Sequence, residues 1–213
     1  MIIAIDGPTA SGKGTIARAV GAHLGLPVLD TGLLYRVAAA AALRAGVDLA
    51  DGAGVAALAA DARAGDFTMD HLRGAEVGQG ASIVAAHPEV RRALLEAQRG
   101  FARQPGGAVL DGRDIATVIC PDADLKLYVD ASVPERARRR QAELAARGEV
   151  VPIAEMEAQI AARDARDMGR ADAPLRRVPD AILLDTTDLS IDAAIARACR
   201  LAEDVRARLG QRR

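Results

Sequence analysis

Runs of consecutive apolar residues recur along the chain and are separated by longer segments in which apolar positions repeat every three to four residues. Apolar runs without polar alternation are typical of strands that are covered on both faces of a parallel sheet. They predict five strands, at residues 2–5, 26–30, 108–111, 124–130 and 181–185. Strands that alternate with helices form parallel sheets with right-handed crossovers. We therefore predict an α/β protein of three layers, in which helices cover both faces of a five-stranded parallel sheet.

The segments with helical periodicity predict the helices of the two outer layers. Ser132 and Pro134 are typical of the cap and the first turn of a helix, and Thr31 is a candidate cap for another. The last predicted helix follows Ser190. The other predicted helices cover about residues 13–24, 32–45, 88–103 and 134–147.

Two segments fit this sheet poorly. Residues 47–80 are rich in Ala, Gly and Asp, and residues 148–179 are crowded with Arg and Asp. Their positions in the chain place them over the carboxyl ends of the strands, where sheets of this type bind ligands. We expect a single domain, residues 1–213, in which the two segments interrupt a core. That core comprises residues 1–46, 81–147 and 180–213.

The composition agrees with a globular protein, because 50% of the residues are hydrophobic and 27% are charged. The net charge of −1 and an aromatic content of 2% argue against a nucleic-acid partner. No apolar segment is long enough to span a membrane, and the amino terminus lacks a secretion signal. The two cysteines, Cys120 and Cys199, indicate neither a disulfide framework nor a zinc site. We expect a cytoplasmic monomer without membrane or nucleic-acid partners.

A glycine-rich loop follows the first predicted strand and opens the first predicted helix. In this context the sequence GPTASGKGT predicts a P-loop, whose backbone N–H groups converge on phosphate oxygens. Lys13 is one of only two lysines, and its ammonium suits the β- and γ-phosphates. Gly14 stands where the common pattern has Ser or Thr, and the hydroxyl comes one residue later, at Thr15. The predicted phosphate-binding residues are Gly7, Pro8, Thr9, Ala10, Ser11, Gly12, Lys13, Gly14 and Thr15.

Polar clusters also follow the second and third predicted strands. Residues 30–36 include Thr31 and Arg36, and residues 111–114 read Asp-Gly-Arg-Asp. Taken singly, each cluster is more often a helix cap or a turn with a surface ion pair. Because neighbouring parallel strands end at the same edge of a sheet, together they predict a second anion pocket beside the P-loop.

A third cluster lies in the segment 148–179. Arg163, Arg166, Asp167 and Arg170 share one face of a predicted helix by their spacing. A solvated face with ion pairs is one interpretation of this pattern, and a set of planar donors that closes over phosphate oxygens is the other. The run at residues 138–140 allows the same two interpretations.

The motifs together resemble those of bacterial cytidylate kinases. The resemblance is carried by IDGPTASGKGT (5–15), LDTGLLYR (29–36), ASIVAAHPEVR (81–91), LDGRDIATVICPDADLKLYVDAS (110–132) and RDARDMGRADAPL (163–175). It implies the P-loop NTPase fold, with a small monophosphate-binding insert at about residues 47–80 and a helical lid at about 148–179. Residues 67–77 are abbreviated here, and Gly74 replaces a more usual Thr, so the insert is expected to be smaller.

The resemblance also implies a reaction, the transfer of the γ-phosphoryl group of ATP, with Mg²⁺, to CMP or dCMP. The catalytic residues would be Lys13, Arg166, Arg113 and Arg36. Arg36 and Arg113 would hold the acceptor phosphate, and Arg166 would reach over the transferring group. Thr15 and Asp111 are candidate Mg²⁺ ligands, directly or through water.

The implied acceptor site is built from residues far apart in the sequence. Thr31 would contact the sugar side, and Arg163 and Asp167 would approach the ribose. Ser82, Arg91 and Asp114 would read the cytosine edge. The full set is Thr31, Tyr35, Arg36, Ser82, Arg91, Arg113, Asp114, Arg163, Asp167 and Arg170.

Two alternatives are compatible with the residues. The first is another small-molecule kinase on the same scaffold, with adenylate, shikimate or dephospho-coenzyme A as acceptor. The second is a P-loop regulatory or nucleic-acid-binding ATPase. Gly14 and the absence of a basic net charge argue against the second alternative.

Overall fold

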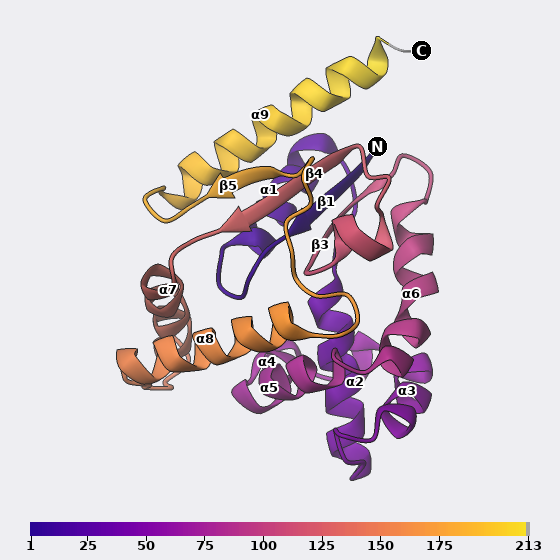
Figure 1. The fold of residues 1–213 in the computed structure, drawn as a ribbon, viewed down its shortest axis with the longest axis vertical. Helices are drawn as coiled ribbons and strands as arrows, with labels where there is room; N and C mark the ends of the chain where they lie inside the picture. The colour runs from indigo at the N-terminus through magenta and orange to yellow at the C-terminus, as the bar shows by residue number, and fades with distance from the viewer. Residues whose placement is uncertain (212–213) are drawn as a thin grey trace.

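A computed structural model describes residues 1–211, and its centre is a parallel five-stranded sheet between layers of helices (Figure 1). The strands run in the order β2-β3-β1-β4-β5. They are β1 (Ile2–Asp6), β2 (Val28–Asp30), β3 (Ala108–Gly112), β4 (Leu125–Asp130) and β5 (Ile182–Asp185). The predicted parallel sheet is confirmed. Residues 212 and 213 of the predicted core lie outside the described residues.

Nine α-helices connect and cover the strands within residues 1–211. They are α1 (Lys13–Leu24), α2 (Thr31–Ala45), α3 (Gly52–Asp61), α4 (Met69–Arg73), α5 (Ala75–Val84), α6 (Pro88–Ala102), α7 (Val133–Ala145), α8 (Ile153–Gly169) and α9 (Ile191–Gly210). A short π-helical turn, η2 (Ile115–Ile119), follows β3, and a 3₁₀ turn spans Ala64–Asp66. No helix of this part of the chain has both the length and the apolar character that a membrane span requires.

Both faces of the sheet are largely buried at the three central strands, β3, β1 and β4, as the uninterrupted apolar runs predict. The edge strand β5 differs, because Ile182 and Leu183 are exposed. Ile3 and Ile5 of β1 pack with α1 and α9, through residues such as Ile16 and Ala198. Ala4, between them, points to the opposite face and packs with α6 and η2. Alternate residues of one strand therefore serve two different cores.

Helix caps fix where the chain leaves the sheet. Ser132 and Ser190 cap α7 and α9 through their hydroxyls. The prediction that Thr31 caps α2 is wrong, because the cap is Asp30, which accepts a hydrogen bond from the Leu33 N–H at 3.2 Å. The Thr31 hydroxyl instead donates to the carbonyl of Asp111 at 2.8 Å, an acceptor that the end of β3 leaves available.

The two segments that fitted the sheet poorly are helical. Residues 47–84 contain α3, α4 and α5, which pack against α2, and α8 packs against α7. Figure 1 shows α8 crossing the space beyond the strand ends, where it contacts α5. Gly74 is the N-cap of α5 and offers no side-chain cap, which a Thr at this position could supply. The boundaries of the insert and of the lid stay predictions.

Candidate active site

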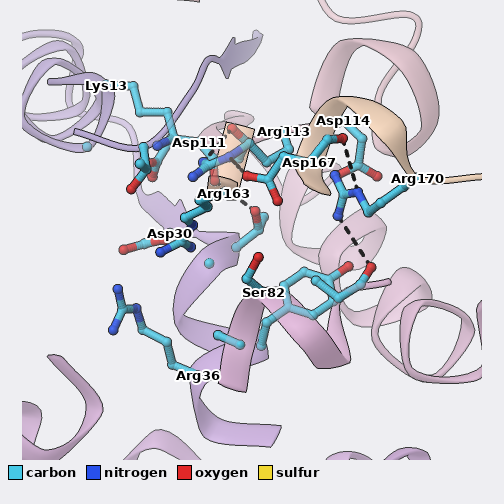
Figure 2. Close-up of a pocket in the computed structure, with 18 residues that line it drawn as sticks. Lys13, Asp30, Arg36, Ser82, Asp111, Arg113, Asp114, Arg163, Asp167 and Arg170 are labelled. Carbon is cyan, nitrogen blue, oxygen red and sulfur yellow. Dashed lines mark hydrogen bonds and ion pairs between the residues drawn. The ribbon is translucent and has the colours of Figure 1, made fainter. Parts of the chain in front are cut away.

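The carboxyl edge of the sheet opens into a hollow that combines the three predicted clusters (Figure 2). Its walls come from the P-loop, the start of α2, α5, the end of β3 and α8. The predicted site residues that line it are Thr9, Lys13, Gly14, Thr31, Tyr35, Arg36, Ser82, Asp111, Arg113, Asp114, Arg163, Asp167 and Arg170. Segments separated by up to about 160 residues thus contribute to one site.

The P-loop is curled by backbone conformations that few residues adopt. A Cβ on Gly7 would lie 2.0 Å from the carbonyl oxygen of Val129, and Gly12 has a φ of 90°. Ala10, which is not a glycine, has a φ of 58°. Such a conformation at Ala10 costs energy and is typical of functional loops. Gly12 caps α1 without a side chain, so the first N–H groups of the helix are available to an anion.

Lys13 and Asp111 both line the hollow, and their charges interact. Burial and the nearby Arg113 lower the pKa of Lys13 to about 7, and burial and Asp30 raise the pKa of Asp111 to about 6. The Nζ atom of Lys13 has a long hydrogen bond, 3.4 Å, to the carbonyl of Pro8. These groups are weakly solvated, so a bound phosphate and its counter-ion would restore the favourable interactions that they lack.

The oxygen donors near Lys13 suit a hydrated magnesium ion. Asp30 and Asp111 are register partners on β2 and β3, and the Asp111 carboxylate lies beside the open side of Gly14. Thr15 follows Gly14 in α1 and does not line the hollow; it is exposed and accepts a hydrogen bond from Arg18 at 3.3 Å. Within residues 1–211 no group of three or more potential metal ligands exists. This donor set fits Mg²⁺, which keeps several waters and binds few protein ligands.

The arginines of the hollow repel one another, and some of their N–H donors have no acceptor. Arg163 has its pKa lowered to about 9 by burial and by Arg113. Burial and Arg140 lower the pKa of Arg36, whose Nη1 donates to the Leu72 carbonyl at 2.7 Å. Among the described residues, the buried Nε of Arg163 and Nη2 of Arg170 have no acceptor. Buried guanidinium donors without acceptors indicate an anionic ligand.

Arg91 lies behind the hollow rather than in its wall. It pairs with the buried carboxylate of Asp114, donates to the Tyr35 hydroxyl at 3.3 Å, and pairs with Asp172 at 3.1 Å. Burial and Asp114 raise the pKa of Tyr35 to about 12, so its hydroxyl stays protonated. Asp114, Tyr35 and Ser82 therefore face the hollow, and Arg91 supports two of them from behind. Its predicted contact with a base stays a prediction.

Arg166 lines an adjoining hollow between α5 and α8 instead of the main one. This second hollow shares Thr9 and Arg163 with the first, and it also contains Arg140. Arg166 is exposed, and its Nε lies 3.4 Å from the hydroxyl of Ser82. The predicted role of Arg166 therefore depends on a movement of the guanidinium toward the shared wall.

The sequence did not reveal a third hollow, on the other side of the P-loop. It is lined by Ser11, Gly12, Arg139, Thr186 and Leu189, among others. Arg139 donates to the Thr186 carbonyl at 2.7 Å, and the Thr186 hydroxyl lies 3.1 Å from the Ser11 carbonyl. Thr186 follows β5 at the sheet edge that carries the other clusters. Its position directly after a predicted strand could have indicated it as a site residue. Arg139 belongs to the run at residues 138–140, for which the sequence allowed either a solvated face or donors to phosphate oxygens.

Comparison with known proteins shows the family of the chain. The profile of a family described as cytidylate kinase matches residues 3–204. The chain is 54% identical to the cytidylate kinase of Methylocella silvestris, over 95% of this chain and 94% of that protein. It is 55% identical to the cytidylate kinase of Cereibacter sphaeroides, over 94% of each chain. A crystal structure of an uncharacterized protein from Eubacterium ventriosum is similar in fold, with a TM-score of 0.52, 14% identity, and coverage of 94% and 96%. This chain therefore belongs to the cytidylate kinase family.

Proposed function

We propose that this protein transfers the γ-phosphoryl group of ATP to CMP and to dCMP, which yields ADP and CDP or dCDP. The observation that supports this proposal most is the pair of buried guanidinium donors without acceptors, on Arg163 and Arg170, in a hollow that adjoins a P-loop. The names of the relatives, cytidylate kinases, support the choice of acceptor.

The P-loop residues 7–15 bind the phosphates of ATP, with Lys13 against the β- and γ-phosphates. The hollow on the far side of the P-loop receives the nucleoside of ATP, because it continues from Gly12 toward Arg139, Thr186 and Leu189. This direction leads away from the acceptor hollow, so the two nucleotides meet at their phosphate ends.

The acceptor nucleotide occupies the main hollow. Arg36 and Arg113 hold its phosphate, Thr31, Arg163 and Asp167 surround the sugar, and Tyr35, Ser82, Asp114 and Arg170 enclose the base. Arg91 fixes the orientation of the Asp114 carboxylate. A buried carboxylate beside a hydroxyl suits the amino group and ring edge of cytosine, which present one donor next to acceptors.

The chemical step requires positioning and charge rather than a general base. A phosphate monoester has its second pKa near 6, so the acceptor is largely dianionic at neutral pH and already nucleophilic. The main obstacle is repulsion between two polyanions and the spread of charge over the moving group. Lys13, Arg36 and Arg113 offset this charge, and Arg166 moves in from the adjoining hollow to contact the transferring group.

Mg²⁺ bound with ATP near Asp111 and Thr15 would neutralise negative charge on the β- and γ-phosphate oxygens. The lid, residues 148–179, carries Arg163, Arg166 and Asp167, and its closure excludes water. Without that closure, ATP would be hydrolysed in place of transfer.

A panel of acceptors tests the proposal. Purified protein with ATP and Mg²⁺ is incubated with CMP, dCMP, UMP, AMP, shikimate or dephospho-coenzyme A, and ADP and the phosphorylated product are quantified. We expect CMP and dCMP to give the highest kcat/KM. Preference for AMP or another acceptor would overturn the substrate assignment. ATP hydrolysis that nucleic acid stimulates, without transfer to any nucleotide, would support the regulatory ATPase instead.

The proposal extends to the surroundings of the enzyme. Both cysteines are free, and Cys120 is buried, which suits a reducing compartment such as the cytoplasm. We propose that the protein acts as a monomer on small-molecule substrates, without nucleic acid. Sedimentation equilibrium at several protein concentrations checks the monomer, and a mass that rises with concentration would contradict it.

A further inference from the structure

The carboxylate of Asp6 is buried, and the proposed reaction does not use it. It lies against residues 112–116, the segment that follows β3 and carries Arg113 and Asp114. Asp6 is the last residue of β1, and it is 2% exposed. It is not among the residues that line the three hollows described above. Its role must therefore be exerted through other residues.

Each carboxylate oxygen of Asp6 accepts one hydrogen bond from the backbone of η2. Oδ1 accepts from the N–H of Ile115 and Oδ2 from the N–H of Ala116, both at 2.8 Å. The first N–H groups of a helical turn have no acceptor within the turn itself. Asp114, at the cap position, makes no such bond, because its carboxylate pairs with Arg91. Asp6 thus caps the turn from a neighbouring strand and leaves Asp114 to face the hollow.

The backbone on both sides of Asp6 is held in place by its neighbours. It is the register partner of Gly112, the residue before Arg113. It also precedes Gly7, where even a methyl group would collide with the Val129 carbonyl, at 2.0 Å. The same residue therefore joins the start of the P-loop to the loop that carries Arg113 and Asp114.

We propose that Asp6 is a positioning residue for the acceptor half of the site, which holds residues 112–116 so that Arg113 and Asp114 meet the acceptor nucleotide in a fixed geometry. This inference rests on the proposed function. Burial raises the pKa of Asp6 to about 7 in spite of the two N–H bonds. A carboxyl group at this position is costly to bury, and its two hydrogen bonds to the loop offset part of that cost.

The test is the Asp6→Asn variant. Asn replaces one acceptor oxygen by an NH₂ group, which faces a backbone N–H as a second donor. We expect the KM and the Kd for CMP to rise about tenfold, since one bond is lost and one donor is left unsatisfied. The Kd for a non-hydrolysable ATP analogue should change less than about twofold.

The matched control is Asp124→Asn. The Asp124 carboxylate accepts a hydrogen bond from the N–H of Ile2 at 2.7 Å. It is therefore also an aspartate that bonds to a backbone N–H, but at the opposite end of β1. This variant should leave the CMP Kd unchanged. Equal weakening of CMP and ATP-analogue binding in Asp6→Asn, or no change in either, would overturn the inference. Wild-type protein that fails to phosphorylate CMP would overturn the proposed function instead, so the two failures are distinguishable.

A measurement on the wild-type protein covers the case in which Asp6→Asn does not fold. Hydrogen exchange of the Ile115 and Ala116 amides is followed with and without CMP. We expect both amides to be protected, and CMP to slow their exchange further, because the acceptor stabilises the loop that these bonds hold. Rapid exchange of both amides, or exchange that CMP leaves unchanged, would contradict the role of Asp6.

Discussion

The carboxylate of Asp167 on α8 accepts a hydrogen bond from the Nε of Arg113 at 2.8 Å, which joins α8 to the loop that follows β3. Burial opposes ionisation of Asp167, but Arg113 and Arg163 outweigh it and hold the pKa of this carboxyl below its ordinary value. The bond to Asp167 uses the Nε of Arg113, and Nη1 donates to the carbonyl of Gly112 at 3.3 Å. Nη2 therefore stays available to an acceptor phosphate. The position of α8 and the orientation of the Arg113 side chain are therefore coupled.

Asp167→Asn removes the charge from this pair with little change in shape. We expect the KM for CMP to rise about tenfold, equivalent to about 1.4 kcal/mol, because Arg113 loses its charged support. The KM for ATP should stay within about twofold of the wild-type value. Steady-state kinetics with each substrate varied in turn measures the split, and a KM for ATP that rises as much as that for CMP would contradict it.

The two lysines of the chain offer a matched pair of variants. Lys13→Ala should lower kcat by about 10²-fold or more, because a fixed positive charge is lost where negative charge develops in the transition state. Lys126, on β4, forms an ion pair with Asp180 at 2.6 Å and lines none of the three hollows. Lys126→Ala should keep wild-type kcat in the coupled assay. Near-normal turnover in Lys13→Ala would be incompatible with the proposed P-loop chemistry.

Arg166→Ala separates binding from catalysis. Arg166 lies outside the main hollow, so both nucleotides should bind with nearly unchanged Kd, whereas kcat should fall on the order of 10²- to 10³-fold. Isothermal titration and single-turnover kinetics measure the two effects. Arg138→Ala is the control, because the Arg138 side chain is 68% exposed and pairs with Glu135. An unchanged kcat in Arg166→Ala would contradict this role and would favour the alternative, in which Arg166 belongs to a solvated helix face with ion pairs.

Thr186→Val tests the hollow assigned to the ATP nucleoside. The variant keeps the shape of the side chain but removes a hydroxyl that contacts Asp130, Ser11 and Arg139. We expect the KM for ATP to rise roughly threefold to tenfold, as the loss of a buried hydrogen-bonded group implies. The KM for CMP should not change. An effect confined to CMP would place the ATP nucleoside elsewhere.

The pH dependence of stability follows from Asp6. Because burial raises its pKa from 3.8 to about 7, the folded protein binds this proton more tightly than the unfolded chain does. The contribution of Asp6 to stability is therefore complete below pH 3.8 and is lost as the pH rises through about 7. Relative to Asp6→Asn, the wild-type free energy of unfolding should fall by about 1.4 kcal/mol per pH unit between these values.

Urea unfolding of both proteins across this pH range checks the slope. The charged neighbours of Asp6, Asp114 and Arg113, are present in both proteins, so the difference between them isolates the carboxyl group. A difference that is constant with pH would mean that Asp6 titrates at its ordinary value.

The sheet was predictable from the sequence because its signal is local. A strand covered on both faces excludes polar side chains from consecutive positions, and Ile2–Ile5 and Ala108–Leu110 record this directly. The polar clusters at the strand ends were predictable for a related reason. Once the strands are parallel, every strand ends at the same edge, so Lys13, Asp30 and Asp111 converge without further information.

The direction in which each side chain points was not predictable. Thr31 has the residue type of a cap but donates to Asp111, and Arg91 supports Asp114 from behind the hollow. Arg166 shares a helix face with Asp167 by spacing, yet it lines a different hollow. Side chains at neighbouring positions on one face of a helix can extend into two different cavities. The packing of α8 against α5 decides which cavity each side chain enters.

The sequence by itself therefore determined the strands, the P-loop and the edge at which the chemistry lies, since each depends on residues close together in the chain. Only the tertiary structure decided which groups meet. Asp6 and Ile115 are 109 residues apart, and their hydrogen bond exists because β1 and β3 are neighbours in register. Contacts of this kind depend on the relative placement of whole elements, which no local pattern encodes.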